Sequence, residues 1–193
     1  NDIPSWIYEI YSIEIDVSRN DKNNAVVSIK DHGTGISVSS LKAICNVGQS
    51  YRSRIEAKQE IDEMPEWLKP TANFGIGLQS CFMATDKFDI ITNSTVDNAL
   101  KITFESGKDS GYVNVKEVAE HISRGSLVEI EFKYDMNFSY DMFGFTAQNL
   151  MRVEPFETNC IVMYKIIESI FKECDRSFFN INVCSKELNF QQT

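Results

Sequence analysis

Alternation of apolar and polar residues marks the first predicted strand. The segment SIEIDVS places Ile13, Ile15 and Val17 on one face, which is the pattern of a strand with one buried side. The polar segment RNDKNN follows, and AVVSIKD then returns as a second alternating segment. Two such segments joined by a polar turn predict an antiparallel hairpin. Asp31 is the last residue of its second strand.

The segments that follow do not alternate, and they predict two helices separated by a charged surface segment. SVSSLKAICNVG predicts a short helix that begins at Ser37 or Ser39 as its N-cap and ends at Gly48. Residues 49–72 are rich in charge, contain two prolines and have no continuous apolar face. Such a segment is expected at the surface. LQSCFMAT, which begins at Leu78, is apolar and predicts a buried helix.

The second half of the chain is predicted to be mostly strand. KFDIIT, ALKITFES, GYVNVKEV and SLVEIEF are separated by turn sequences, which is typical of an antiparallel meander of three or four strands. NCIVMYKIIESIFKEC has apolar residues at helical spacing, and FFNINVCSKEL alternates as a closing strand. We therefore predict one α+β domain over residues 1–193, with a mostly antiparallel mixed sheet and helices on one face.

Composition and charge restrict the classes of function. The 193 residues are 42% hydrophobic and 24% charged, which is sufficient for a globular core. A formal net charge of −9 argues against non-specific binding to nucleic acid or to a membrane surface. No apolar run approaches the ~20 residues of a membrane-spanning helix. The N-terminus does not read as a signal peptide and lacks an initiator Met, so we expect a fragment of a longer chain.

The cysteines predict a cytoplasmic location rather than a disulfide framework. Their number is odd and no pair has C-x-x-C spacing, so we interpret them as free thiols in a reducing compartment. The five positions are Cys45, Cys81, Cys160, Cys174 and Cys184. Only two histidines could supply imidazole ligands, and no metal site made of protein side chains is predicted.

A glycine loop, DHGTGI, follows the second strand. An ionised carboxylate at Asp31 only accepts hydrogen bonds, which suits a ligand with an exposed amino group such as adenine. Gly33 and Gly35 lack Cβ atoms, so the backbone can approach a flat ring or adopt a positive φ. Ile36 would form an apolar wall. A turn in which Asp31 bonds its own backbone explains the same pattern.

A second glycine loop, NFGIGLQS, precedes the predicted apolar helix. Gly75 and Gly77 would let a polyphosphate approach the free N–H groups at the helix start. Mg²⁺ would offset the repulsion between the phosphates and an acidic protein. A tight packing loop with Asn73 as a cap is the alternative. The loop is no P-loop, because no Lys-Ser or Lys-Thr follows, and Ser80 stands where a dinucleotide-binding loop has its third glycine.

Taken in this order, the two loops and their flanking elements resemble the GHKL ATPase superfamily with its Bergerat nucleotide-binding fold. The chain is most similar to the N-terminal ATP-binding domain of the ninety-kilodalton heat-shock chaperones, from about Ser12 to Leu188. The resemblance is carried by DHGTGIS, LKAICNVGQS, NFGIGLQSCFMATDKFDIIT, ALKITFESGKDSGYVNV and RGSLVEIEF. It implies a Bergerat-type two-layer α+β sandwich.

The resemblance implies a set of contacts with ATP or ADP. Asp31 would accept the adenine amino group, Gly35 would lie beside the base, and Ser126 would support the adenine site through Asp31 and a water. The other cofactor-binding positions implied are Gly33, Ile36, Asn46, Phe74, Gly75, Ile76 and Gly77. Residues 49–72 would be the lid that folds over bound ATP. The implied protein partners are clients, other domains of the parent chain and a second copy bound through regions outside this sequence.

Hydrolysis is a separate question. Members of the family carry a general-base Glu, and one turn later a Mg²⁺-binding Asn, on a helix upstream of the first strand. No clear Glu-x-x-x-Asn precedes Ser12, so this helix either lies upstream of the sequence or has been lost. No catalytic residue is assigned, and ATP hydrolysis is expected only with an upstream Glu. The alternative is a non-hydrolysing nucleotide-binding module with a regulatory or scaffold role.

Overall fold

The computed structural model divides the chain into two compact units, which are described separately. Unit 1 comprises Asn1–His32 and Leu127–Thr193, and unit 2 comprises Gly33–Ser126. The residues that the structure describes are 7, 10–22, 24–44, 62, 77–95, 97–107, 111–119, 123–132, 166–170, 172, 180–186 and 190–192.

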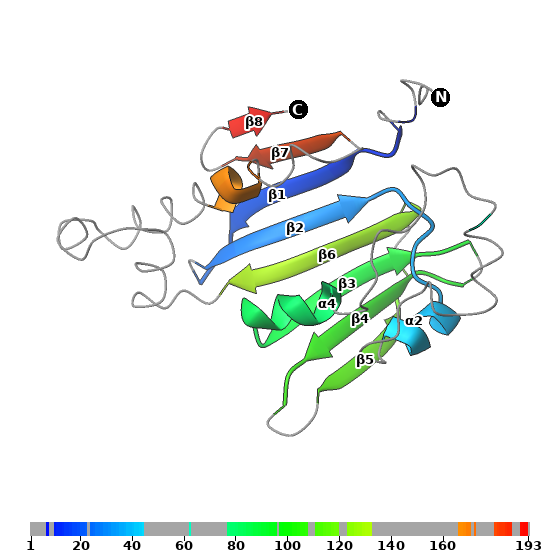
Figure 1. Ribbon diagram of the computed structural model, residues 1–193. Coiled ribbons are helices and arrows are strands. Elements are labelled where there is room, and N and C mark those ends of the chain that lie inside the picture. Colours follow the sequence, from blue (N-terminus) through cyan, green and yellow to red (C-terminus); the bar gives the residue numbers. More distant parts are fainter. Residues whose placement is uncertain are drawn as a thin grey trace. The chain divides into compact units, whose positions relative to one another are not determined.

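Unit 1 contains a mixed sheet built on the predicted hairpin (Figure 1). β1 (Ile13–Arg19) pairs antiparallel with β2 (Ala25–Asp31), as the alternation predicted. β7 (Ile181–Ser185) pairs parallel with β1, and β8 (Phe190–Gln192) pairs antiparallel with β7. β6 (Gly125–Phe132), most of which belongs to this unit, lies beside β2. The strand order in unit 1 is therefore β6-β2-β1-β7-β8.

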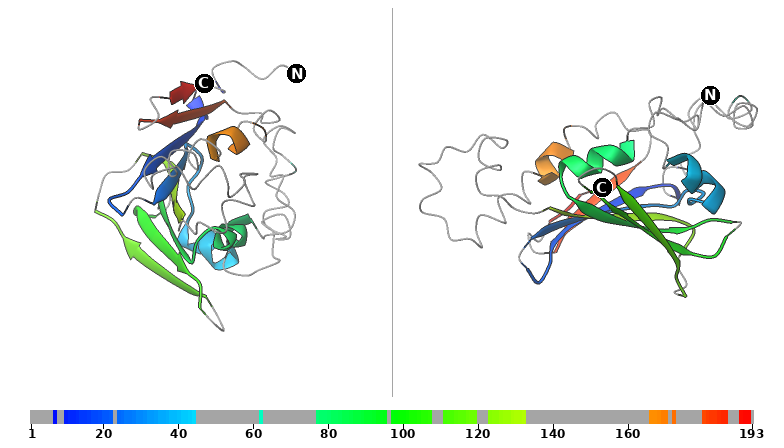
Figure 2. Two further views of the ribbon diagram at one scale, coloured as in Figure 1. Left: turned by 90° about the vertical axis from the view of Figure 1, so that its left-hand side faces the viewer. Right: turned by 90° about the horizontal axis from the view of Figure 1, so that it is seen from below.

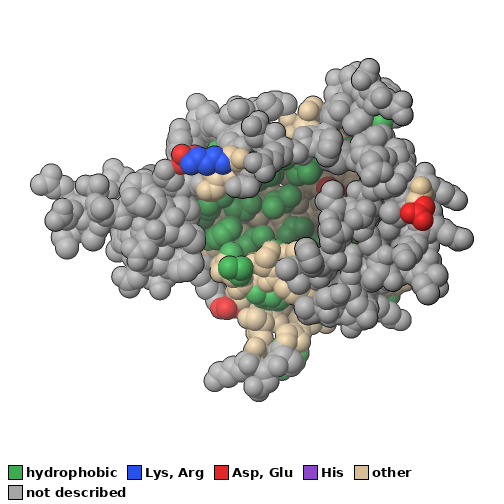
Figure 3. Space-filling model, viewed as in Figure 1, with side chains coloured by type: hydrophobic (Ala, Val, Ile, Leu, Met, Phe, Trp, Pro, Cys, Tyr) green, Lys and Arg blue, Asp and Glu red, His purple; other side chains and the backbone are tan. Residues whose placement is uncertain are grey.

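The core of unit 1 lies on one face of these strands. Val17 and Val183 are completely buried, and they cluster with Val27 of β2. Ile167, from the helical segment 166–170, packs into the same cluster, so the amphipathic helix predicted for this region is confirmed in its described part. Figure 3 shows hydrophobic side chains gathered over β2 on this face. The alternation of apolar and polar residues predicts which face is buried, because every second side chain of a strand points to the same face.

Unit 2 contains a three-stranded antiparallel meander in the order β5-β4-β3. Its strands are β3 (Lys87–Asn93), β4 (Leu100–Glu105) and β5 (Tyr112–Glu117). The predicted meander thus ends after three strands, because SLVEIEF forms β6, which lies beside β2 rather than beside β5. Exposure fits this order: all six residues of β5 are exposed, as at a sheet edge, whereas β6 carries buried residues.

Alternation also sets the core of unit 2. Phe88, Ile90 and Thr92 are buried on one face of β3. The ring of Phe88 stacks on that of Phe104, with 5.0 Å between ring centroids, and Ile102 lies opposite Ile90 in the strand register. Aromatic pairs of this kind contribute about 0.5–1.5 kcal/mol beyond the area that they bury.

The described helices of unit 2 lie on one face of its meander, as Figures 1 and 2 show. They are α2 (Val38–Ile44) and α4 (Gly77–Ser80), the latter continued by the 3₁₀ turn η3 (Cys81–Met83). The mostly antiparallel strands and the helices on one face of each unit's strands confirm the predicted α+β class.

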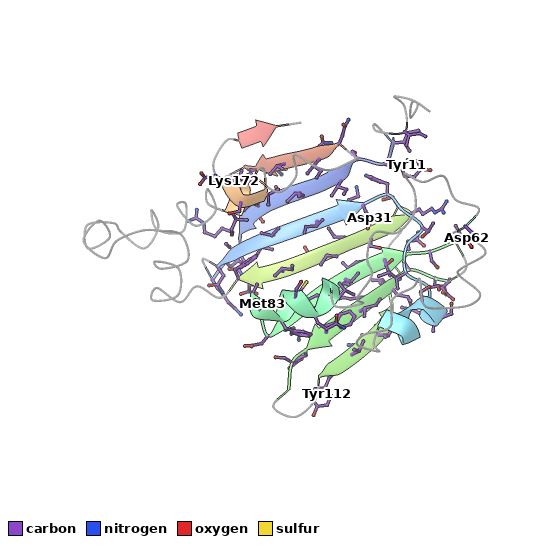
Figure 4. All side chains as sticks on the ribbon, in the orientation of Figure 1. Tyr11, Asp31, Asp62, Met83, Tyr112 and Lys172 are labelled. Carbon is purple, nitrogen blue, oxygen red and sulfur yellow. The ribbon has the colours of Figure 1, made fainter. Side chains whose placement is uncertain are left out.

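The prediction that LQSCFMAT forms a buried helix is wrong. No residue of α4 or η3 is buried, and Met83 is 84% exposed and projects from the surface (Figure 4). One α-helical turn followed by a 3₁₀ turn is too short to carry a continuous apolar stripe. The contact that remains is the edge of Phe82 against Phe88, with 5.2 Å between ring centroids.

The start of α2 confirms one of the two predicted N-caps. The hydroxyl of Ser37 accepts the backbone N–H of Ser40 at 3.2 Å, which is the bond that an N-cap side chain makes to the third helical residue. The backbone N–H of Val38 donates to the carboxylate of Asp97 at 2.9 Å. A carboxylate at this end also interacts favourably with the helix dipole.

We expect Ser37→Ala to lower the free energy of unfolding by about 1 kcal/mol, because the N–H of Ser40 loses its acceptor. Urea denaturation followed by circular dichroism measures this change. Ser39→Ala is the control, since position 39 lies inside the helix, where alanine is favoured. Equal losses for the two variants would contradict the assignment of Ser37 as the cap.

Candidate functional site

Asp31 ends β2 in unit 1, where the sequence placed it (Figure 4). Its neighbours Lys30 and His32 both contact Glu14 of β1. The His32 Nε2 atom lies 2.8 Å from Glu14 Oε1, and the Lys30 Nζ atom lies 3.4 Å from Glu14 Oε2. The hydrogen bond with His32 is the main cause that lowers the pKa of Glu14.

These flanking contacts fix the face from which Asp31 projects. Side chains alternate along a strand, so a residue between Lys30 and His32 points to the opposite face. That face carries Val27 and Ile29, which belong to or pack against the core of unit 1. Asp31 is half-buried there. The strand therefore places a carboxylate at its end, in register with the apolar face rather than with the charged outer face.

The glycine loop after Asp31 opens unit 2 and is held tightly at Gly35. Its φ is +70°, a left-handed conformation that side chains disfavour. A Cβ atom added there would collide with the carbonyl oxygen of Asn93, and it would lie 2.6 Å from the carbonyl carbon of Asn93 and 2.9 Å from the backbone nitrogen of Ser94. The positive φ that the sequence predicted for this loop is confirmed at Gly35. The loop backbone packs directly on the end of β3.

Thr92 connects the glycine loop to the start of β6 within unit 2. Its Oγ1 atom accepts the backbone N–H of Ile36 at 2.8 Å and donates to the carbonyl oxygen of Gly125 at 3.2 Å. The hydroxyl of Ser126 lies 3.1 Å from the same atom. Thr92 is completely buried. The structure thus brings together two predicted site residues, Ile36 and Ser126, through a residue that sequence reasoning did not select.

Thr92 could have been found from the alternation of its strand. In KFDIIT the inward positions are Phe88, Ile90 and Thr92, so a hydroxyl occupies a position where the pattern requires an apolar side chain. Buried polar groups are hydrogen-bonded in native structures. A threonine in an inward register beside two glycine-containing segments therefore indicates a local network.

The second glycine loop is described only at its end. Gly77 is the first residue of α4 rather than a residue before the helix, and it is exposed. A Cβ atom added at Gly77 would meet nothing within 4 Å. Four other predicted site residues lie outside the described residues: Asn46, Phe74, Gly75 and Ile76. The predicted lid at 49–72 also lies outside them, apart from Asp62.

Two described cysteines are free, Cys81 and Cys184. Burial raises the pKa of both thiols, and that of Cys184 reaches about 11, with a further contribution from a hydrogen bond to Asp16 at 3.1 Å. Thiols with raised pKa values are protonated at neutral pH and are poor nucleophiles.

The described residues contain no group of three His, Cys, Asp or Glu side chains able to hold a metal ion. None of the described helices has the length and hydropathy to cross a membrane. A cavity of about 350 Å³ lies on the outer face of β3, β4 and β5, where Lys101 pairs with Asp89 at 2.8 Å and Lys87 pairs with Glu105 at 3.6 Å. It contains none of the predicted site residues.

Sequence comparison identifies chaperones among the proteins similar to this chain, although no protein-family model matches it. The chaperone protein HtpG of Shouchella clausii is 28% identical over 144 residues, which are 74% of this chain and 22% of the relative. The mitochondrial TNF receptor-associated protein 1 homolog of Dictyostelium discoideum is 30% identical over 121 residues, or 62% of this chain and 16% of the relative.

The HtpG protein of Rhizobium meliloti is 29% identical over 115 residues, which are 57% of this chain and 18% of that protein. The chain thus spans about a fifth of the length of these curated relatives. The α+β fold, the strand-end aspartate and the glycine loop accompany these similarities. The sequence similarity to these chaperones agrees with the resemblance of this chain to the N-terminal ATP-binding domain of the ninety-kilodalton heat-shock chaperones of the GHKL superfamily.

Proposed function

We propose that this chain is the adenine-nucleotide-binding domain of a chaperone ATPase. The observation that carries the proposal is the placement of Asp31 at the end of β2, in register with the apolar face. A carboxylate offers only acceptors, and it matches the 6-amino group that adenine carries and guanine lacks. The similarity to chaperones supports the same function.

The glycine loop supplies the second part of the proposed adenine site. Gly35 adopts a left-handed conformation and packs against the end of β3, at a position where a side chain would collide with the β3 backbone. The resemblance to the family would place this loop backbone beside the base. Gly33, Ile36 and Ser126 would complete this part of the site.

The phosphates and Mg²⁺ are assigned from the resemblance to the family. Asn46 would face the nucleotide, and the triphosphate would follow Phe74, Gly75, Ile76 and Gly77, with residues 49–72 closing as a lid. The described residues contain no cluster of metal ligands of their own. The ion would be bound mainly through the phosphates, as Mg²⁺ commonly is.

The chain would bind the nucleotide, and hydrolysis would in addition require a general-base Glu upstream of the first strand. A non-hydrolysing module of the same fold would use the same adenine contacts. The single domain at 1–193, protein clients, a homodimer formed through other regions and a cytoplasmic location remain parts of the proposal.

We expect ADP with Mg²⁺ to raise the melting temperature of the 193-residue chain. A ligand that binds only the native state at 100 times its dissociation constant stabilises it by about 2.7 kcal/mol. Differential scanning fluorimetry over a series of ADP concentrations measures the shift, with GDP as the matched control because it lacks the 6-amino group. Equal shifts with the two nucleotides would contradict the adenine assignment.

A further inference from the structure

The strand β5 has one edge that no described strand covers. It pairs with β4 on one side, and among the described residues nothing pairs with its other side. All six of its residues are exposed, and Figure 4 shows Tyr112 projecting at its start. The register with β4 is continuous from Tyr112 to Glu117, so no bulge interrupts the strand, and it contains no proline. Bulges and prolines are features that protect a sheet edge from pairing with another chain.

The odd-numbered residues of β5 present their backbone groups at this edge. The backbone N–H of Val118 donates to the carbonyl oxygen of Ala99 at 2.8 Å, and this pair continues the register of β4 and β5. Backbone groups of successive strand residues point alternately to the two sides. The even-numbered residues therefore bond toward β4, whereas Val113, Val115 and Glu117 direct their N–H and C=O groups outward.

The apolar face of unit 2 continues to the same edge. Val113 lies opposite Phe104, and Val115 lies opposite Ile102. Phe104 and Ile102 are buried, whereas Val113 and Val115 are 41% and 40% exposed. A strand added beside β5 would cover both valines, because side chains at opposed positions of paired strands lie on the same face.

The sequence of β5 is complementary to itself when two copies pair antiparallel about a two-fold axis at Asn114. In that register Val113 lies opposite Val115 of the second copy, and Tyr112 lies opposite Lys116 of the second copy. Valines thus meet on one face, and an aromatic ring meets an ammonium group on the other, which is a favourable pair. No two like charges are opposed.

Neighbouring registers lack this match. An axis at Val113 would place Val115 opposite Gly111, and an axis at Val115 would place Val113 opposite Glu117. A two-fold axis at a position between residues would pair inward-facing with outward-facing backbone groups, so it forms no ladder. Only the axis at Asn114 pairs each valine with a valine.

We propose that β5 is a docking edge for a second copy of this chain, which pairs with it antiparallel in the register centred on Asn114. The same surface is used by both copies, so the contact closes as a dimer. It is separate from a homodimer formed through regions outside this sequence, and it does not depend on nucleotide binding. One strand pair buries less area than a standard protein–protein interface, so the dimer forms at high protein concentration.

Sedimentation velocity of the 193-residue chain without nucleotide, at protein concentrations from about 10 μM to 1 mM, measures the monomer–dimer equilibrium. Val115→Lys places a charge on the apolar side of the edge, and the symmetry introduces it twice. We expect the dissociation constant to rise about tenfold or more. Val38→Lys is the matched control, because Val38 of α2 is 44% exposed and lies outside β5; it should keep the wild-type dissociation constant.

A cysteine substitution tests the register directly. The two copies of position 114 would form a non-hydrogen-bonded pair, with Cα atoms about 4.5 Å apart, which is within the range of a disulfide. With oxidised glutathione, Asn114→Cys should form a covalent dimer well above the level of the wild type and its native cysteines. Tyr112→Cys, on the same face, should stay at the wild-type level, because position 112 lies opposite position 116 and not opposite itself.

A chain that stays monomeric over the whole concentration range would overturn the proposal. An unchanged dissociation constant in Val115→Lys would also overturn it, because the second copy would then bind elsewhere. Circular dichroism shows whether Val115→Lys is folded, and if it is not, the cross-linking of Asn114→Cys decides. Equal cross-linking of Asn114→Cys and Tyr112→Cys would overturn the pairing centred on Asn114.

Discussion

Asp31→Asn is expected to lower the affinity of the chain for ADP by about 10- to 100-fold. Hydrogen bonds to a charged group contribute about 1.5–3 kcal/mol, and replacing the carboxylate by an amide removes the charge while keeping the shape. The amide also carries an NH₂ group, which would face the amino group of adenine in one of its two orientations. Isothermal titration calorimetry with Mg²⁺ present measures the change.

Asp21→Asn is the matched control for this experiment. Asp21 lies in the exposed turn between β1 and β2, and its substitution changes the net charge by the same amount. We expect this variant to bind ADP within twofold of the wild type, so that a general charge effect is excluded. Melting temperatures measured without ligand show whether either variant is destabilised. Wild-type affinity in Asp31→Asn would remove the adenine assignment.

Local alternation predicted most of the strands because a strand with one buried face carries its own signal. Val17 of β1 and Ile90 of β3 are buried where the period-2 pattern puts them. The hairpin was also predictable, since a polar turn between two alternating segments leaves few other pairings. The position of Asp31 followed from the end of its strand, without knowledge of any distant contact.

Two features of the fold could not be predicted from the sequence, because they depend on contacts with residues far away along the chain. SLVEIEF alternates in the same way whether it lies beside β5 or beside β2, so its place in the sheet could not be derived from its pattern. LQSCFMAT is apolar enough for a buried helix, but its helical part ends after one turn and Met83 is exposed. Composition alone does not determine how long a helix continues.

The network around Thr92 shows the same limit at the site. Thr92 is 56 residues from Ile36 and 33 residues from Gly125 along the chain. The roles of the glycine loop and of Ser126 in the adenine site were implied by a resemblance, and that resemblance did not indicate Thr92. Only the fold shows that Ile36 of the loop and Ser126 both contact the Thr92 hydroxyl.

Gly35→Ala is expected to lower the free energy of unfolding by about 2–5 kcal/mol. Two costs add: about 1–2 kcal/mol for a side chain in a left-handed conformation, and about 1–3 kcal/mol for forcing extra atoms into a packed region. The added Cβ atom would lie 2.6 Å from the carbonyl carbon of Asn93. Urea denaturation measures the loss. Gly77→Ala is the control, because a Cβ atom there meets nothing within 4 Å and alanine favours a helix.

A second substitution separates the two costs at Gly35. Asparagine tolerates the left-handed conformation better than alanine does, but it brings the same Cβ atom. The colliding backbone belongs to the end of β3, next to the completely buried Thr92, so it has little freedom to move away. We therefore expect Gly35→Asn to recover less than half of the stability that Gly35→Ala loses. Recovery to near the wild-type value would mean that the left-handed φ, and not the packing on β3, requires glycine in this loop.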